Sequence, residues 1–206
     1  MNVFVLCTGR CGSHTFIEAC RHISNYSAGH ETRSRFTGNE RLNYAANHIE
    51  ADNRLSWFLG RLDRIYGDEA FYVHLTRDRQ RNAASMSRYM HMGILKAYTD
   101  GILMRSSYRN DPMEFSLDLY DTINMNIESF LKDKSRKMEF TLENAKQDFK
   151  VFWEKIGAEG DLDAALGEWE ITYNKSKVDI LENVNQAFRK LRQKFKRPIE
   201  KDFPSL

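Results

Sequence analysis

The sequence has no long apolar run, little net charge and few cysteines, and each shortage excludes a class of protein. No segment of the 206 residues approaches the roughly 20 consecutive apolar residues of a membrane-spanning helix, and the apolar run after Met1 is too short for a secretory signal. A formal net charge of +2 is too small for a protein that coats nucleic acid or a membrane surface. We therefore expect neither a membrane span nor a nucleic-acid partner.

Cysteine and proline are equally scarce. The three cysteines, an odd number without a secretory signal, predict free thiols in a reducing compartment, and hence a cytoplasmic protein. Cys7, Cys11 and His14 come nearest to a metal-ligand set, but a strand and a helix would scatter them, so no metal is expected. With three prolines, no repeat and no Gly- or Pro-rich linker, residues 1–206 are expected to form a single domain.

The sequence does contain a pattern of alternating strands and helices. Short apolar runs rich in strand formers alternate with segments of helical periodicity along the first 90 residues. The expected strands cover 3–7, 45–50 and 71–76, and the expected helices cover 14–23, 54–66 with Asn53 as cap, and 80–91. Such alternation predicts an α/β fold of three layers, in which helices flank a central, mostly parallel sheet.

The second half of the chain is mainly helical by the same criteria. A helical pattern rich in Met and Tyr covers 94–132, and a further helix at 143–156 follows an expected strand at 136–142. An apolar stripe over 180–195 predicts a C-terminal helix, whose basic residues we interpret as its solvated face. The fold is therefore expected to have a helical C-terminal part.

The segment most informative about function lies between the first strand and the first helix, and reads Thr8-Gly9-Arg10-Cys11-Gly12-Ser13-His14-Thr15. A glycine-containing turn there exposes backbone N–H groups at a helix N-terminus, where the helix dipole also favours an anion. Arg10 adds a fixed positive charge, and Ser13 and Thr15 add hydroxyl donors. This is more donors than an ordinary helix cap requires, so we interpret the segment as a phosphate-binding loop.

Two widespread nucleotide-binding motifs do not fit this loop. The Walker pattern G-x-x-x-x-G-K-[ST] fails because Gly9 and Gly12 are too close together and His14 stands where a Lys is needed. The dinucleotide pattern G-x-G-x-x-G fails as well. Phosphoryl transfer normally uses Mg²⁺ and such a Lys to offset several negative charges, so the missing Lys fits the less charged sulfuryl group better.

The loop resembles that of the sulfotransferase family, in which a small residue is followed by Lys or Arg and then by Ser-Gly-Thr-Thr or a close relative. In this chain Cys11 replaces the usual Ser and His14 replaces a common Thr. The resemblance implies a P-loop-like sulfotransferase fold and the donor 3′-phosphoadenosine 5′-phosphosulfate (PAPS), which leaves as adenosine 3′,5′-bisphosphate (PAP). It implies a catalytic Arg10, and 5′-phosphosulfate binding by Arg10, Cys11, Gly12, Ser13, His14 and Thr15, with no metal required.

A second motif lies at the end of the clearest expected strand. Arg77 follows that strand, and Ser85 lies eight positions later on the expected helix 80–91. Arg offers a bidentate fork and Ser a hydroxyl, which together suit a terminal phosphate. The family's 3′-phosphate site likewise combines an Arg at a strand end with a Ser eight residues later. The resemblance therefore implies that Arg77 and Ser85 bind the 3′-phosphate of PAPS.

An acceptor hydroxyl must lose its proton, and three residues are candidates for the base. His48 lies on the expected strand 45–50, and the resemblance favours it because cytosolic members carry a catalytic His on the like strand. Glu31 follows the first expected helix, where carbohydrate-modifying and bacterial relatives carry a catalytic Glu, and His30 is its neighbour. We place His48 first and Glu31 second.

The leading hypothesis is a sulfotransferase that moves a sulfuryl group from PAPS to a hydroxyl acceptor on a carbohydrate, a lipid or a small molecule. Asp78 closes an apolar strand as a Walker B acid would, so a nucleotide-dependent kinase is the second hypothesis. A non-catalytic nucleotide-binding module is the third, because a fold does not fix a function.

Overall fold

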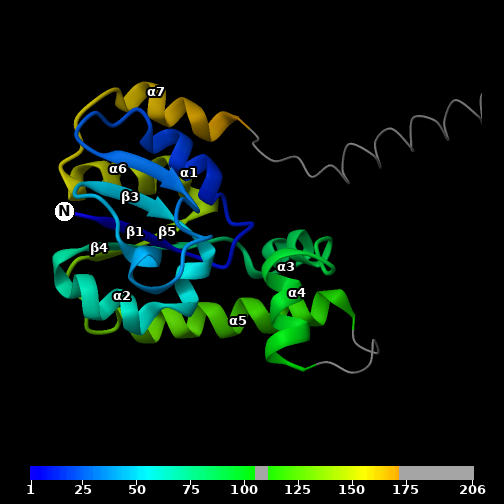
Figure 1. Ribbon diagram of the computed structural model, residues 1–206. Helices are drawn as coiled ribbons and strands as arrows, with labels where there is room; N and C mark the ends of the chain where they lie inside the picture. Colours follow the sequence, from blue (N-terminus) through cyan, green and yellow to red (C-terminus); the bar gives the residue numbers. More distant parts are fainter. Residues whose placement is uncertain (105–110, 172–206) are drawn as a thin grey trace, which may run out of the picture. The chain divides into compact units, whose positions relative to one another are not determined.

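A parallel sheet of five strands organises the computed structural model, which describes residues 1–104 and 111–171 (Figure 1). In chain order the strands are β1 (Val3–Leu6), β2 (Ser27–His30), β3 (His48–Ala51), β4 (Phe71–Thr76) and β5 (Lys137–Thr141). Their order in the sheet is β2-β3-β1-β4-β5, and every neighbouring pair is parallel. The predicted α/β fold with a parallel central sheet is confirmed.

The strand register brings the ends of the five strands to the same level. Val3 of β1 lies opposite Ile49 of β3 and Phe71 of β4, so the three strands start within a residue or two of one another. Because all five run the same way, the connections that leave their carboxyl ends emerge on one side of the sheet. We call this side the carboxyl edge. It is where parallel α/β sheets place their binding sites.

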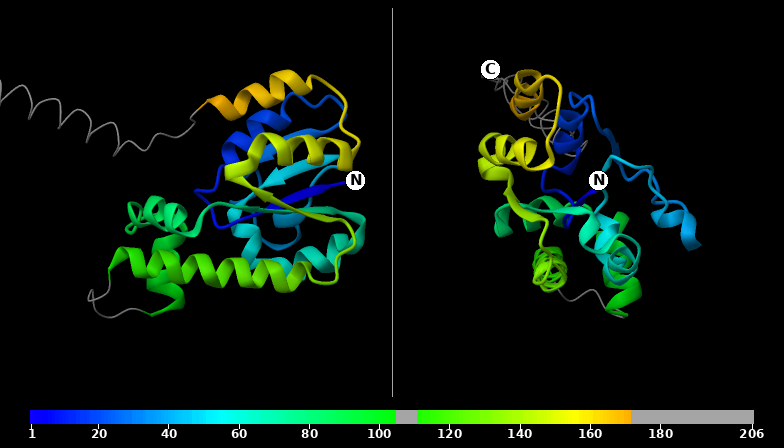
Figure 2. Two further views of the ribbon diagram at one scale, coloured as in Figure 1. Left: turned by 180° about the vertical axis from the view of Figure 1, so that it is seen from behind. Right: turned by 90° about the vertical axis from the view of Figure 1, so that its left-hand side faces the viewer.

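One face of the sheet is covered by α1 (Ser13–Cys20), α6 (Ala145–Ile156) and α7 (Leu162–Gly167) (Figures 1 and 2). Phe16 of α1 lies at the centre of this layer and is fully buried. Its ring centroid lies 5.1 Å from that of Phe140 on β5 and 4.9 Å from that of Phe152 on α6. Aromatic packing between helices and sheet therefore holds the start of α1, and with it the loop before α1.

The opposite face is covered by α2 (Leu59–Tyr66) and the long α5 (Pro112–Leu131). Leu119, Ile123 and Ile127 recur every four residues along α5 and are buried against the sheet, as expected for one stripe of a helix. Two shorter helices, α3 (Arg79–Ser87) and α4 (Gly93–Ala97), lie beyond the carboxyl edge (Figure 1). Helices on both faces complete the three predicted layers.

Several elements differ from the sequence-based expectation. The strand expected at 45–50 covers His48–Ala51, and β2 was not expected because Ser-Ala-Gly-His contains no apolar run. Asp52 rather than Asn53 provides the cap of the following 3₁₀ turn η2 (Asn53–Trp57), because its side chain accepts a hydrogen bond from the backbone N–H of Arg54.

The helical pattern expected over 94–132 is interrupted. It comprises α4, a π-helical turn at Tyr98–Ile102 and α5.

The expected C-terminal helix over 180–195 lies outside the described residues, so the single domain 1–206 stays a prediction. Of the helices that the structure describes, none combines the length and the apolar composition that crossing a bilayer requires.

The aromatic cluster around Phe16 predicts a large stability effect. We expect Phe16→Ala to lower the free energy of unfolding by about 3–5 kcal/mol, because the substitution leaves a cavity among packed rings. Phe36→Ala is the matched control: Phe36 is 49% exposed, so its truncation should cost less than about 1 kcal/mol. Urea unfolding of both variants measures the difference. Equal losses would contradict the account of the core.

Candidate functional site

The loop from Thr8 to Thr15 leaves β1 at the carboxyl edge and turns into α1 with an unusual backbone. Gly9, Arg10 and Gly12 have φ angles of 85°, 58° and 95°, all in the left-handed region. A Cβ on Gly9 would lie 2.7 Å from Asn53 Nδ2, and one on Gly12 would lie 2.7 Å from Leu142 Cδ1. The turn therefore needs glycine at both positions, for conformation and for space.

Gly12 is the N-cap residue of α1 and has no side chain to cap the helix. No side-chain hydrogen bond caps the first turn, and the first helical bond runs from the backbone N–H of Phe16 to the carbonyl of Gly12, at 2.9 Å. This end of α1 carries the positive end of the helix dipole. A helix N-terminus without a side-chain cap can bind an anion, and this role of the loop stays a prediction.

Two buried thiols, those of Cys7 and Cys11, lie at the start of the loop. The hydrogen bond between Cys7 and Cys11 raises the pKa of Cys7 and lowers that of Cys11. Backbone N–H groups of Gly9 and Ser13 lower the pKa of Cys11 further, against the effect of burial. Because the Cys11 thiol is buried beneath the loop, Cys11 can offer only its backbone to a ligand.

The two motifs predicted from the sequence meet at this loop. The Nε of Arg10 donates a hydrogen bond to Ser85 Oγ at 3.1 Å, on helix α3. The Nη1 of Arg77, directly after β4, donates to the carbonyl oxygen of Arg10 at 3.2 Å. Arg10 therefore contacts Arg77 through its backbone and Ser85 through its side chain, although 67 residues separate Arg10 from Arg77 in the sequence.

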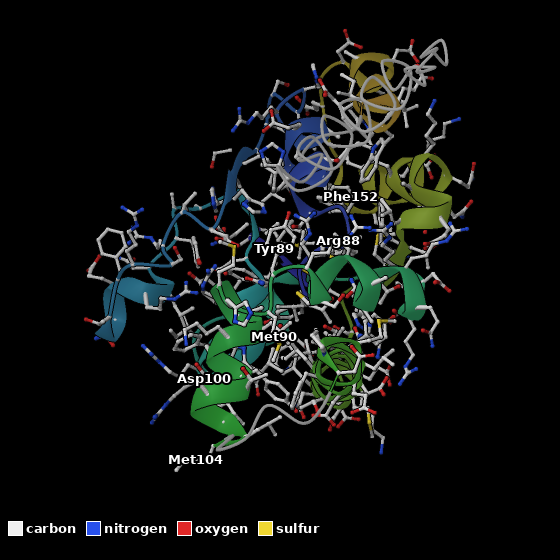
Figure 3. The ribbon with its side chains drawn as sticks, turned by 90° about the vertical axis from the view of Figure 1, so that its right-hand side faces the viewer. Arg88, Tyr89, Met90, Asp100, Met104 and Phe152 are labelled. Carbon is white, nitrogen blue, oxygen red and sulfur yellow. The ribbon has the colours of Figure 1, made fainter. Side chains whose placement is uncertain are left out.

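Three residues that the sequence analysis missed support this arrangement. Asn82 is fully buried on α3, and its Nδ2 donates to Thr8 Oγ1 at 3.2 Å and to the carbonyl of Gly9 at 3.0 Å. The ring of Tyr89 lies 4.7 Å from the guanidinium carbon of Arg10, near the middle of the view onto the carboxyl edge in Figure 3. The hydroxyl of Tyr120 donates to the carbonyl of Arg77 at 2.9 Å. Asn82 and Ser85 are three residues apart, so helical spacing alone could have linked them.

The other side of the loop is formed by the end of β2 and by η2. Ser13 Oγ and His30 Nε2 lie 3.1 Å apart, and burial lowers the pKa of His30. Glu31 follows β2 with a left-handed φ of 54°, and its carboxylate pairs with Arg54 Nη1 at 2.7 Å. Arg54 is next to Asn53, whose amide lies against Gly9. His30 and Glu31 are therefore held beside the loop from Thr8 to Thr15.

His48 lies elsewhere. It is the first residue of β3, opposite Ser27 at the start of β2, and so sits at the amino end of the sheet rather than at the carboxyl edge. Its ring nitrogens lie 2.8 Å from Ser27 Oγ and 2.9 Å from Glu50 Oε2. The structure does not bring His48 to Arg10, because β3 begins three residues later than the sequence predicted.

Asp78 lies between β4 and α3. The Asp78 carboxylate caps α3 by accepting a hydrogen bond from the backbone N–H of Arg81 at 2.8 Å. A helix-capping role thus accounts for the acid after β4 that had suggested a Walker B motif. Within residues 1–104 and 111–171, no group of three or more His, Cys, Asp or Glu side chains is arranged to hold a metal ion.

Comparisons with known proteins bear on the fold. No family model matches the sequence, and no curated protein matches it in sequence. In structure the chain is similar to mouse sulfotransferase SULT7A1 complexed with PAP, with a TM-score of 0.53 and 12% identity. The match covers 87% of this chain and 66% of the mouse chain, so the chain spans just under two thirds of that relative. The chain has the sulfotransferase fold, as the motifs predicted.

The loop backbone yields a test that depends on stability alone. Gly12→Ala forces an L-residue into a left-handed conformation and a Cβ into Leu142, so we expect the free energy of unfolding to fall by about 1–3 kcal/mol. Gly60→Ala, within α2, has open space around the added Cβ and should be neutral or stabilising by up to about 1 kcal/mol. Thermal unfolding compares the two. A neutral Gly12→Ala would show that the turn is not constrained.

Proposed function

We propose that this chain, on its sulfotransferase fold, moves a sulfuryl group from PAPS to a hydroxyl acceptor. The observation that carries the proposal is that Arg10 contacts both Ser85 and Arg77 at the loop before α1, whose first turn has no side-chain cap. A donor with phosphate groups at both its 5′ and 3′ ends needs two cationic anchors, and Arg10 and Arg77 would supply them. The structural relative was crystallised with PAP, the product of such a donor.

The residues of the site fit the donor. The backbone of Cys11 and Gly12, together with Ser13, His14 and Thr15, would hold the 5′-phosphosulfate at the N-terminus of α1. Arg77 and Ser85 would hold the 3′-phosphate through a guanidinium fork and a hydroxyl. Tyr120 donates a hydrogen bond to the carbonyl of Arg77, and Asn82 donates one to the carbonyl of Gly9 in the loop.

Arg10 has the catalytic role in this proposal. In an in-line transfer the acceptor oxygen bonds to sulfur while the bond from sulfur to the bridging phosphate oxygen breaks. PAP leaves with that electron pair, and the hydroxyl proton passes to a base. Arg10 would stabilise the charge that develops on the bridging oxygen, and the loop N–H groups would orient the sulfuryl oxygens. Positioning and electrostatics then account for the rate, without a metal.

We assign the base to Glu31. It lies at the carboxyl edge, beside the loop, and Arg54 orients its carboxylate at 2.7 Å. His30, its neighbour, lies 3.1 Å from Ser13 Oγ at the start of α1, where the 5′ end of the donor is proposed to bind. His48 was the first choice from the sequence, but both of its ring nitrogens have partners at the amino end of the sheet. The geometry therefore favours Glu31.

We also propose a cytoplasmic location. Cys7, Cys11 and Cys20 are free and buried, as expected for a protein that keeps its thiols reduced.

Donor binding is the first test. Calorimetry should show that PAP binds more tightly than ATP with Mg²⁺, and that Arg10→Ala and Arg77→Ala each weaken PAP binding at least about tenfold, because each removes a charge-assisted contact. Arg64→Ala is the matched control, since Arg64 is exposed on α2. Tighter binding of ATP would instead favour the kinase, and PAP binding without transfer to any acceptor would favour the non-catalytic module.

The identity of the base is tested by measuring single-turnover sulfation with PAPS bound to the enzyme. We expect Glu31→Gln to slow single-turnover sulfation by about 100-fold or more, because general-base catalysis typically contributes that much, while PAP affinity is unchanged. His48→Gln should slow sulfation much less than Glu31→Gln does. Full activity of Glu31→Gln would remove Glu31 from the mechanism.

A further inference from the structure

A fully buried carboxylate lies directly behind the turn that carries Glu31. Glu50, on β3, has no exposed surface and accepts three hydrogen bonds. Its Oε1 accepts from the backbone N–H of Thr32 at 2.7 Å, and its Oε2 accepts from Thr32 Oγ1 at 2.7 Å. The third partner is His48 Nε2, 2.9 Å from Oε2. No Lys or Arg in the described part of the chain forms an ion pair with Glu50.

His48 is itself held in place. Its Nδ1 lies 2.8 Å from Ser27 Oγ, and its ring stacks on Tyr44 with centroids 5.5 Å apart and an interplanar angle of 11°. With Nδ1 accepting from the Ser27 hydroxyl, Nε2 carries the proton and donates to Glu50. The chain of contacts therefore runs from Ser27 through His48 and Glu50 to Thr32, the residue after Glu31.

The turn is shaped around this carboxylate. Gly29 lies opposite Glu50 in the register of β2 and β3. A Cβ on Gly29 would lie 2.3 Å from Thr32 Cγ2 and 3.0 Å from Glu50 Oε2. Glycine at position 29 leaves room for the Thr32 side chain beside the carboxylate, and the turn between these two residues includes the left-handed φ of Glu31. Two hydrogen bonds to one residue, from its backbone and its side chain, fix both the position and the orientation of the turn.

Burying the Glu50 carboxylate costs desolvation free energy, which a purely structural role in the sheet does not require. β3 is flanked by strands on both sides, and its neighbours Ile49 and Ala51 are fully buried. An apolar residue of similar size would avoid the desolvation of a carboxylate, and such replacements are often neutral or stabilising. Glu50 accepts two hydrogen bonds from Thr32, which an apolar residue could not do.

We infer that Glu50 is a positioning residue: held by His48, its buried carboxylate fixes Thr32 and thereby aims Glu31 at Arg54 and the phosphate-binding loop. The inference rests on the proposed role of Glu31 as base. It gives His48 a place in the same reaction, as the donor that holds Glu50 rather than as the group that takes the acceptor proton.

Thr32 offers the cleanest test, because it lies at the surface and its substitution should leave the fold intact. Thr32→Val keeps the branched shape but removes the hydroxyl, and Thr32→Ser keeps the hydroxyl. We expect Thr32→Val and Glu50→Gln to lower kcat about tenfold or more through misplacement of Glu31, with the KM for PAPS unchanged. Thr32→Ser should retain most of the wild-type kcat. Equal kcat values for Thr32→Val and Thr32→Ser, with Glu50→Gln as active as wild type, would overturn the inference.

A second measurement does not depend on activity. Amide hydrogen exchange, followed by NMR, should be slow at Thr32 in the wild type and faster in Glu50→Gln, while amides of β1 are unchanged. Unchanged exchange at Thr32 would overturn the inference. Exchange at Thr32 could respond as expected while the wild type neither binds PAP nor transfers a sulfuryl group. The proposed function would then fail, and the role of Glu50 in fixing the turn would stand. Loss of activity in His48→Gln equal to that in Glu31→Gln, with Glu50→Gln active, would make His48 the base.

Discussion

The left-handed backbone at Gly9, Arg10 and Gly12 is the constraint on which the rest of the site depends. It turns the chain from β1 into α1 within a few residues and sends the Cys11 thiol inward. It also leaves Arg10 with its carbonyl toward Arg77 and its guanidinium toward Ser85. For a non-glycine residue this conformation costs about 1–2 kcal/mol, and the hydrogen bond from Arg77 is one of the contacts that hold it.

One flank of the loop carries guanidinium groups, and the other carries carboxylates. On the α3 side lie Arg10, Arg77 and the hydroxyl of Ser85, which suit the phosphate groups of a donor. On the β2 side lie the carboxylates of Glu31 and Glu50, with Arg54 and His48 as their partners. The proposed sulfuryl transfer would use this separation, because one flank would stabilise the leaving anion while the other accepts a proton. The parallel sheet produces it by bringing all strand ends to one edge.

How far the sequence predicts this structure depends on how local each signal is. The glycine turn and the strand β4 could be predicted because both are determined by a few neighbouring residues. The strand β2 could not, because Ser-Ala-Gly-His forms a strand only by pairing with β3. The same pairing starts β3 three residues later than predicted, which places His48 at the amino end of the sheet. Asn82 and Glu50 were missed because their partners lie 73 and 18 residues away.

A crystal structure of the complex with PAP tests the central claim most directly. The account predicts the 5′-phosphate on the backbone N–H groups that follow Gly12, and the 3′-phosphate between the guanidinium of Arg77 and the hydroxyl of Ser85. It also predicts that Arg10 exchanges its bond to Ser85 for the 5′ end of the ligand. A nucleotide bound away from the loop, or one whose 3′-phosphate touches neither Arg77 nor Ser85, would contradict the account.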